Sequence, residues 1–562
     1  MKKLKVGFLV DELIVSHYVY ELINHVCQED LFCEPTLIHG YGKKPSLRKF
    51  SNSLFLNFGL IKVINQIIFR ILKKIILKIE LPQTIKLYPN YTKEIELNNN
   101  LNYREVLIMG KWSKSGEHLN FTNSDLKLLG EEKFDCIIQC GDGLVNNDIL
   151  NIAKLGIFSF DHNENLLIKG SSAGFWEVFY NKPSSEFVIQ KLTKELNESV
   201  ILEKGNLMTL STWTHNHAQI SEKSNFFLIN LLDKIAESRS LPKSLEPRLN
   251  SNMTIKLDSS VTLFLYILLN LIPLISKKLL NKLLTEKVTR WGIAYSKHND
   301  HTKELSSYKE IKNPSGRFLA DPFVFSHEGK NVIFVEDLFY SDNKGRISAI
   351  QLHENSEEFL GVVLEEDFHL SFPFIFKEKG NVYMIPESTE ARDIRLYRCL
   401  EFPKKWILDK TLMKDVFAAD TMMIKHDNLW FMLTNICSSG IGEYQSELHI
   451  FFSNRHNSTD WKPIEKGNPV LFDSLAGRNG GLFYQNGDIY RVNQIQGKSH
   501  YGKSFGVNRV LHLSSSEYLE ERIRTIDANY KEDIYSTHHF NANSEFAVLD
   551  FCRLERIKNI NK

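Results

Sequence analysis

Three acidic residues in the second half of the chain lie where β-rich segments begin or end, and they are the first candidates for chemistry. Asp321 precedes Pro322, Asp420 lies in the phrase AADTMM, and Glu387 belongs to the phrase IPES. Carboxylates that surround one sugar can divide the work of general acid, base or nucleophile, and pKa modulator. The alternative for Asp321 is a turn cap, because Asp-Pro is a common turn dipeptide. We predict Asp321, Glu387 and Asp420 as catalytic residues of a sugar site.

The elements that would position these residues form a repeat. From Trp291 onward, short β-rich runs alternate with turns that contain Gly, Asn, Asp or Pro, and five strand–turn–strand units begin near 321, 373, 420, 480 and 538. A period of roughly fifty to sixty residues with hairpin texture is typical of a β-propeller. Five such units predict a five-bladed propeller over 291–562. Because the innermost strand of each blade faces the axial channel, residues at the blade starts are expected to converge there.

Further polar residues of this half are candidate ligands of a substrate. Guanidinium groups bind phosphate bidentately, so Arg478 and Arg491 with Gln494 suggest an anionic or phosphorylated ligand. The alternatives are that the arginines pin neighbouring blades together and that the histidines are structural. The predicted substrate-binding residues are Glu336, His369, Arg478, Arg491, Gln494, Tyr501 and His538.

Several phrases of this half carry a family resemblance. FLADPFVF, HLSFPFIF, VYMIPES and RNGGLFYQNGDIYRVNQ resemble the N-terminal propeller domain of the plant glucosamine inositolphosphorylceramide transferases, over 291–552. That domain in turn resembles the five-bladed propellers of arabinanase- and xylosidase-type glycoside hydrolases, which implies a base-like Asp321 and an orienting Asp420. The hydrolases place their acid in a later blade, where this chain has Arg478 and Asn479. The resemblance therefore implies sugar chemistry but speaks against simple hydrolysis, and the plant proteins carry a separate glycosyltransferase domain that this sequence does not contain.

The first 240 residues show a different pattern of apolar and polar residues. LKVGFLV, FDCIIQC and LGIFSFD are apolar strand-like runs, and HYVYELINHVC has helical spacing. Strands that alternate with helices predict an open α/β sheet, which binds its ligands beyond the carboxyl ends of the strands. Each residue at those ends can equally be a turn residue. The predicted pocket residues are Asp11, Asp142, Asp161, His162 and Asn163.

The stretch from FDCIIQCGDG through GIFSFD to SSEFVIQK resembles the N-terminal domain of formyltransferases. That family uses an Asn-x-His pair and a later Asp to bind the formyl donor and to manage the proton of the attacking amine. These positions fall on Ser159, Asp161 and Asn197, so no member of the triad is retained, although a shift of one residue would let His162 serve. Without an imidazole there is no general base for an amine nucleophile. We expect a formyltransferase-like fold with a re-purposed pocket and without a reduced folate.

Two further stretches are apolar and basic: 60–79 is apolar at helical spacing with interspersed Lys and Arg, and 261–284 is an uncharged apolar run followed by a basic tail. The uncharged run of the second is about fifteen residues long, short of the roughly 20 that a membrane span requires. One interpretation is peripheral contact with anionic lipid through basic helices at 60–80 and 261–287. The other, which we favour from the sequence, is that the helices pack on each other or on a partner subunit.

Composition excludes several classes of protein. A formal net charge of +1 gives no general attraction to nucleic acid. The seven cysteines form no CxxC pair, and no cluster has the spacing of a metal site. The N-terminal MKKLKVGFLVDE is typical of a first strand rather than a signal peptide. We expect a cytoplasmic protein, peripheral at most to the inner face of the plasma membrane.

Together these patterns predict a formyltransferase-like α/β domain at 1–240, a basic helical connector at 241–290 and a five-bladed propeller at 291–562. The expected function is that of an intracellular carbohydrate-active transferase, of glycosyltransferase type, in surface polysaccharide or glycolipid biosynthesis. Its sugar site would lie in the propeller, and a nucleotide-activated sugar would be the donor. The alternatives are a glycoside hydrolase, a sugar-amine formyltransferase and a non-catalytic glycan-binding scaffold. The sugar and the oligomeric state do not follow from these patterns.

Overall fold

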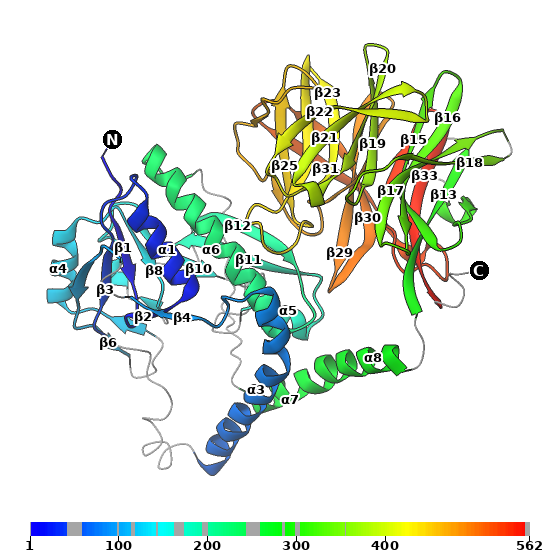
Figure 1. Cartoon of the computed structure of the whole chain (residues 1–562). Helices are drawn as coiled ribbons and strands as arrows, with labels where there is room; N and C mark the ends of the chain where they lie inside the picture. Colours follow the sequence, from blue (N-terminus) through cyan, green and yellow to red (C-terminus); the bar gives the residue numbers. More distant parts are fainter. Residues whose placement is uncertain are drawn as a thin grey trace. The chain divides into compact units, whose positions relative to one another are not determined.

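The chain forms two compact units, which are described separately (Figure 1). One comprises Met1–Gly205 and Thr209–Leu274, and the other comprises Asn206–Met208 and Ile275–Lys562. A computed structural model describes residues 2–41, 59–97, 101–113, 118–141, 144–145, 147–161, 173–193, 200–242, 259–283, 287–297, 304–354 and 356–556.

A seven-stranded sheet forms the centre of the first unit, in the order β12-β11-β10-β8-β1-β3-β5. Its five strands from β10 to β5 are parallel, and β11 runs antiparallel to β10. Every residue of β1 is buried, as expected for a parallel strand covered on both faces. The open α/β sheet predicted for this region is therefore present. The strands are β1 (Val6–Leu9), β3 (Thr36–His39), β5 (Arg104–Leu107), β8 (Cys136–Gln139), β10 (Gly156–Asp161), β11 (Ser184–Lys191) and β12 (Val200–Met208).

The strand order reverses between β1 and β8, which brings their carboxyl ends together. The backbone N–H groups of Cys140 and Gly141 donate to the carbonyl of Leu9 at 2.9 and 3.0 Å. A Cβ on Gly141 would lie 2.2 Å from Asp11 Oδ1, so only glycine fits this close approach. Such a reversal is where open α/β sheets bind their ligands.

Shorter elements complete this unit. Helix α4 begins with a capping box, in which Thr122 and Asp125 satisfy each other's backbone N–H groups. The helices beside the sheet are α1 (His17–Gln28), α4 (Asn123–Glu132), η1 (Asn147–Ile149), α5 (Phe175–Phe179) and α6 (Trp213–Ser238). The small strands are β2 (Ile14–Ser16), β4 (Glu94–Glu96), β6 (Lys111–Trp112), β7 (His118–Asn120) and β9 (Leu144–Val145).

Two long helices correspond to the basic apolar stretches of the sequence. The first is α3 (Gly59–Leu87), and the second runs without interruption through α7 (Ser260–Tyr266), the π-helical turn η2 (Ile267–Leu271) and α8 (Ile272–Leu283). Within the described residues, its portion Ser260–Leu280, with a mean hydropathy of 1.8, is long and apolar enough to cross a membrane by length and composition. Our expectation that this stretch is too short was wrong, because the helix continues past the uncharged run.

The second unit is the predicted five-bladed propeller. Four blades are antiparallel sheets built from consecutive strands, whereas β13 pairs with β33 over its whole length and so closes the ring with strands from both ends of the unit. The five inner strands, β15, β19, β23, β28 and β32, coincide with the predicted unit starts. The closing blade contains β13 (Lys287–Lys297), β14 (Lys309–Ile311), β32 (Phe540–Ala542) and β33 (Phe546–Arg556). The next two contain β15 (Arg317–His327), β16 (Lys330–Phe339), β17 (Lys344–Leu352), β18 (Glu357–Leu364), β19 (Ser371–Glu378), β20 (Asn381–Glu387), β21 (Asp393–Glu401) and β22 (Lys405–Lys414). The last two contain β23 (Ala418–His426), β24 (Leu429–Ile436), β25 (Glu447–Ser453), β26 (Lys462–Pro463), β27 (Leu471–Phe472), β28 (Asn479–Gln485), β29 (Asp488–Gly497), β30 (His500–Leu513) and β31 (Tyr518–Asp527).

Candidate functional site

A β-bulge recurs on the inner strands and positions the candidate carboxylates. In β15, β19 and β23 the inner strand carries one extra residue against its partner, and the residue at the bulge has a positive φ: Asp321 at 49°, Phe372 at 44° and Asp420 at 48°. Aspartate tolerates this left-handed conformation better than most residues. The residue opposite the start of the bulge is Glu336 in one blade and Glu387 in the next. The same backbone feature thus sets the position of four acidic side chains.

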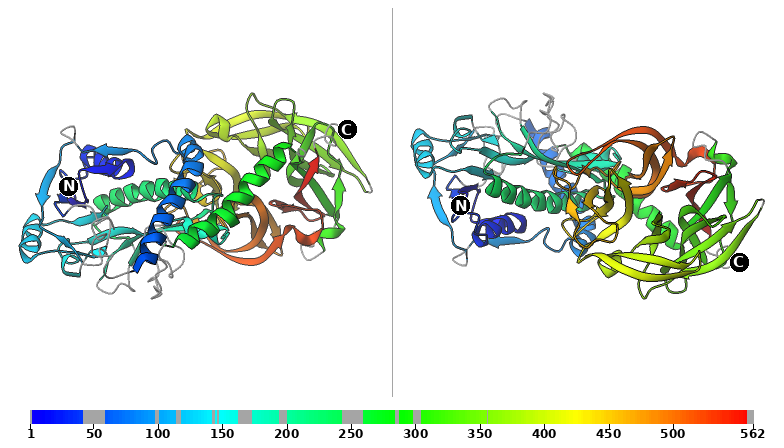
Figure 2. Two further views of the ribbon diagram at one scale, coloured as in Figure 1. Left: turned by 90° about the horizontal axis from the view of Figure 1, so that it is seen from below. Right: turned by 90° about the horizontal axis from the view of Figure 1, so that it is seen from above.

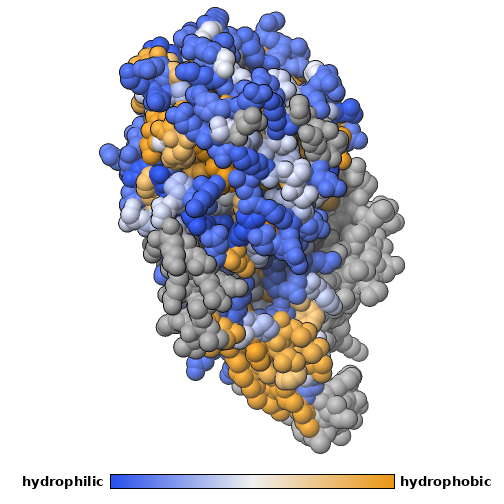
Figure 3. Space-filling model, turned by 90° about the vertical axis from the view of Figure 1, so that its right-hand side faces the viewer, coloured by the Kyte–Doolittle hydropathy of each residue, from blue (hydrophilic) through white to orange (hydrophobic). Residues whose placement is uncertain are grey.

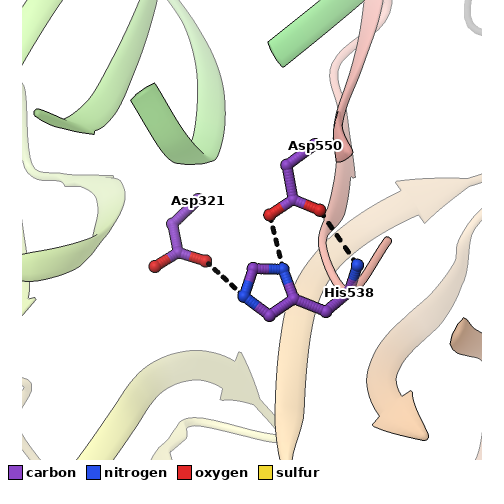
Figure 4. A group of neighbouring side chains, drawn as sticks. All are labelled: Asp321, His538 and Asp550. Atoms are coloured by element: carbon purple, nitrogen blue, oxygen red, sulfur yellow. Dashed lines mark hydrogen bonds and ion pairs between the residues drawn. The ribbon is translucent and has the colours of Figure 1, made fainter. Parts of the chain in front are cut away.

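Asp321 lies in a buried group with residues of the closing blade, drawn in Figure 4. His538 Nδ1 contacts Asp550 Oδ2 at 2.5 Å, and His538 Nε2 lies 3.8 Å from Asp321 Oδ1. The backbone N–H groups of His538 and His539 donate to Asp550 Oδ1 at 2.9 and 3.0 Å. Asp550 therefore fixes the orientation of the imidazole and directs its other nitrogen toward Asp321.

The electrostatics of this group favour a protonated Asp321. Burial raises the pKa of Asp321 well above its ordinary value, and the carboxylates of Glu336 and Asp420 raise it further. Burial alone would also raise the pKa of Asp550, but the charge and hydrogen bonds of His538 outweigh it and hold that pKa low. Asp321 Oδ1 has no hydrogen-bond partner within the described part of the chain. The two carboxyl groups on either side of the imidazole thus have pKa values shifted in opposite directions, upward for Asp321 and downward for Asp550. Such a pair of shifts assigns one group as an acid and the other as a base.

A second group is built around Asp420. Arg478 Nε donates to Asp420 Oδ2 at 2.6 Å, and the Gln494 amide donates to the same oxygen at 3.1 Å. The Arg478 guanidinium also lies 3.7 Å from Glu387 Oε2, and the backbone N–H of Asp420 donates to that oxygen at 3.3 Å. The guanidinium expected to bind a phosphate is therefore occupied by carboxylates of the protein.

The surroundings of Glu387 favour its protonated form near neutral pH. Burial raises its pKa from 4.5 to about 8, Asp420 raises it as well, and Arg478 opposes them. The Thr389 hydroxyl donates to Glu387 Oε1 at 3.1 Å. A carboxyl group that keeps its proton near pH 7 can act as a general acid.

Because folding raises the pKa of Glu387, the free energy of unfolding depends on pH. The native state binds the proton more tightly, so the free energy of unfolding falls as pH rises from about 4.5 to about 8. Glu387→Gln should remove about 2–4 kcal/mol of that fall, so the variant gains stability over the parent as pH rises. Urea unfolding at pH 5 and pH 8 measures the difference, with the exposed Glu517→Gln as control. Parallel curves for parent and E387Q would contradict the assignment.

Aromatic side chains connect the two groups. Trp291 stacks on the His538 ring at a centroid distance of 4.1 Å, and Tyr501 meets the same ring edge-on at 5.2 Å. The guanidinium carbon of Arg478 lies 5.4 Å from the centroid of the Tyr501 ring. Tyr501 is 39% exposed, so it lies at the rim where the cluster meets solvent. At the other side, His369 Nε2 contacts Glu336 Oε1 at 3.2 Å.

Most of the predicted propeller residues therefore share one axial cluster, but Arg491 does not. Its guanidinium is fully buried and donates to Glu520 at 2.6 and 2.7 Å, and also to the carbonyls of Ala476 and Gly477. These hydrogen bonds join β29 to β31 and to the segment before β28, so Arg491 has a structural role. With Arg478 also paired, neither arginine is available for the anionic ligand that we expected.

The predicted N-terminal pocket is only partly defined. Asp11 lies at the end of β1 beside Gly141, and Asp161 is the last residue of β10. Asp142, His162 and Asn163 lie outside the described residues. The structure therefore brings Asp11 to the strand-order reversal, and the rest of the pocket remains a prediction.

Sequence reasoning missed Asp550 and Trp291. Asp550 has a local signal, since it is a charged residue inside the apolar strand run AVLDFC, where a carboxylate needs a partner. Ligand atoms of Asp321, His538 and Asp550 all lie within 4.8 Å of one another, so they could hold a cation. These residues are far apart in the sequence, which is why no spacing pattern indicated them. Because His538 Nδ1 already contacts Asp550, the nitrogen facing Asp321 would be the ligand, with Asp550 orienting it.

The second unit matches a family of known proteins. Residues 289–554 match the family described as "Glucosamine inositolphosphorylceramide transferase 1, N-terminal". Glucosamine inositolphosphorylceramide transferase 1 of Arabidopsis thaliana is 34% identical over 211 residues, which are 37% of this chain and 27% of that protein. The protein of the same name from Oryza sativa subsp. japonica is 34% identical over 208 residues, 36% of this chain and 27% of that protein. The chain thus matches about a quarter of the length of these curated relatives.

Solved structures give weaker likenesses. A family 117 glycoside hydrolase of Zobellia galactanivorans covers 49% of this chain and 93% of its own, at 9% identity and a TM-score of 0.31. A glycinamide ribonucleotide transformylase of Symbiobacterium toebii covers 44% of this chain and 95% of its own, at 11% identity and a TM-score of 0.27. Both TM-scores are below 0.5, so these likenesses have no bearing on function.

Proposed function

We propose that the chain is a carbohydrate-active transferase that takes part in glycolipid assembly, and that the axial cluster of its propeller binds a sugar. The observation that carries the proposal is the position of this cluster. Asp321, Glu387, Asp420 and His538 all lie inside the stretch that matches the N-terminal region of glucosamine inositolphosphorylceramide transferase 1. Buried carboxyl groups of unlike protonation are the groups that sugar chemistry uses.

The charges of the cluster indicate which class of sugar it can bind. Among the described residues it contains five carboxyl groups against one guanidinium and two imidazoles, all three of which already contact carboxyl groups. The carboxyl groups are those of Asp321, Glu336, Glu387, Asp420 and Asp550, and the basic groups are those of Arg478, His369 and His538. An excess of carboxyl groups disfavours a phosphate and favours a ligand with a positive charge. The sugar bound here is therefore an amino sugar or an uncharged sugar. The phosphates of a nucleotide-activated donor, which remains the proposed donor class, would bind elsewhere.

Calorimetry tests this charge preference directly. Glucosamine should bind about tenfold or more tightly than N-acetylglucosamine at pH 6.5, because its ammonium group stabilises the ionised carboxylates. Glu387, with its pKa raised to about 8, holds its proton at that pH, and the pKa of Asp321 is raised as well. Binding of the cation should therefore release protons, while binding of the acetylated sugar should not. Titrations in two buffers of different ionisation enthalpy measure the release. Equal affinity for both sugars without proton release would contradict the charge argument.

The transfer reaction needs its own assay. The full chain is incubated with a panel of nucleotide sugars and a lipid-linked acceptor, and products are read by mass spectrometry. Appearance of a glycosylated lipid supports the proposal. Binding of a sugar without any product would identify a glycan-binding scaffold instead.

Glycoside hydrolysis is the second candidate, because Glu387 keeps its proton at neutral pH and can protonate a leaving group. The same mixtures distinguish it. A hydrolase releases free sugar from a chromogenic glycoside without an acceptor, whereas a transferase requires the acceptor.

For the first unit we propose a formyltransferase-like fold without formyl transfer, because Ser159 and Asp161 stand where that family has its Asn and His. Reduced folate should not raise the melting temperature of the protein. We also propose the cytoplasm as the compartment, since all seven cysteines are free thiols.

A further inference from the structure

Helices α3 and α7 pack against the body of the first unit with one face each. Ile76 of α3 and Leu263 and Tyr266 of α7 are buried together with Phe175 and Trp213 of the neighbouring helices. The backbone N–H of Ser260 donates to Asn65 Oδ1 at 3.1 Å, which joins the two helices directly. The pair therefore has a defined inner face.

A buried polar network fixes this packing. The Tyr266 hydroxyl donates to Glu80 Oε1 at 2.7 Å, and the backbone N–H of Thr214 donates to Glu80 Oε2 at 2.8 Å. The backbone N–H of Trp213 donates to the Tyr266 oxygen at 2.9 Å. Glu80 thus binds the N-terminus of α6 and links it to α3 and α7, so the outer faces of both helices have a fixed orientation.

The outer faces are apolar. On α3 the exposed isoleucines recur at three- and four-residue intervals, which places them in one stripe of a helix with 3.6 residues per turn. The α3 stripe is Ile64, Ile67, Ile68, Ile71, Ile75 and Ile79, each 42–53% exposed. The exposed apolar residues of α7 to α8 are Val261, Phe264, Leu268, Leu269, Ile272, Ile275, Leu279 and Leu280. Seen from below, α3 and α7 lie in front of the other elements of the first unit (Figure 2, left). The space-filling view shows a continuous hydrophobic area in its lower part (Figure 3).

The charges beside these stripes are all positive. Arg70, Lys74 and Lys78 are exposed on α3, and Lys277 and Lys278 are exposed on α8. Lys73 is also exposed, but its Nζ lies 5.7 Å from the centroid of the buried Trp213 ring, so it belongs beside the inner face. Ser260–Leu283 contains no acidic residue, and Glu80, the only acidic residue of α3, is buried. An apolar stripe flanked by cations alone matches the surface of a bilayer that contains anionic lipid.

We propose that α3 and the helix from α7 to α8 form a two-helix platform that lies on the surface of an anionic membrane. The isoleucine and leucine stripes enter the boundary of the acyl chains, and the lysines and arginines contact the headgroups. The helices lie on the bilayer rather than across it, because the inner faces of α3 and of Leu263–Leu271 belong to the core of the first unit. A spanning arrangement of α3 would also bury Arg70, Lys74 and Lys78 in lipid. This inference does not depend on the proposed sugar chemistry.

Vesicle flotation with the full chain tests the platform. The protein should float with vesicles of phosphatidylcholine containing 30 mol% phosphatidylserine, at least tenfold more strongly than with phosphatidylcholine alone, and 0.5 M NaCl should weaken the binding. Ile71→Glu with Leu268→Glu should abolish it, since both side chains are exposed and their loss leaves the packing intact. Met109→Glu, an equally drastic change at a 73% exposed position of the same unit, should leave it unchanged.

Circular dichroism confirms that each variant is folded. Failure of the parent to float with either vesicle, or equal binding by I71E/L268E, overturns the proposal. Protein that stays with the vesicles after washing with 1 M salt at alkaline pH would indicate a spanning helix and also overturns it. A stable dimer in solution that I71E/L268E dissociates, without vesicle binding, would identify the face as an interface between copies.

Discussion

Asp321→Asn should lower turnover of the sugar substrate by about 10²–10⁴-fold while leaving the fold intact. Asparagine has the shape of aspartate and tolerates the left-handed φ of 49° at this bulge. Asp321 is buried, and burial with the neighbouring carboxylates raises its pKa, so a neutral amide should replace it with little loss of stability. Only the ability to exchange a proton is removed. Initial rates and melting temperature, measured on the same preparation, separate the two effects.

The matched control is Asp427→Asn. Asp427 also has a positive φ, of 45°, but lies in an exposed hairpin turn with its side chain 86% accessible. Asp427→Asn should change neither the initial rate nor the melting temperature. If D321N is as active as D427N, Asp321 is only a turn cap and the proposed site fails.

The sequence predicts the blades of the propeller better than the backbone details that orient its side chains. The blades could be predicted because each hairpin repeats an apolar run, a Gly- or Asn-containing turn and a second apolar run, and this local pattern decides strand pairing. Asp321 and Asp420 were found because each precedes such a run. The recurring bulge that orients both could not be predicted, since it is a property of the backbone pairing.

Side chains that depend on contacts between blades were harder to predict. Arg478 directly precedes β28 and Arg491 lies in the blade of β28 to β31, so the two look alike in the sequence. One faces Asp420 at the axis, and the other binds Glu520 of its own blade. Their directions follow from strand register and twist, which the residue types do not encode. The expected anionic ligand was derived from the residue type alone and stays a prediction, and in the structure both guanidinium groups already have carboxylate partners.

The second large effect is expected at Arg478. Its guanidinium is buried and neutralises Asp420 at 2.6 Å, with Glu387 at 3.7 Å. Arg478→Met keeps the apolar stem but removes the charge, so two carboxyl groups remain buried without a cation. Breaking a buried pair from one side costs about 3–5 kcal/mol. Urea unfolding of the propeller should show a loss of this size at pH 8 and a smaller loss at pH 5, where protonation of the carboxyl groups relieves the repulsion.

A double-mutant cycle separates the charge pair from packing. Adding Asp420→Asn to Arg478→Met removes the unpaired charge, while the Asn side chain can still accept the hydrogen bond of Gln494. The double variant should therefore recover most of the lost stability, although it stays inactive. The exposed Arg509, paired with Glu521 at 3.3 Å, is the control, and Arg509→Met should cost less than about 1 kcal/mol. Equal losses for R478M and R509M, or no recovery in the double variant, would show that Arg478 does not hold the axial carboxylates together. Recovery would show that the Arg478 guanidinium compensates the buried charge of Asp420 in the folded protein.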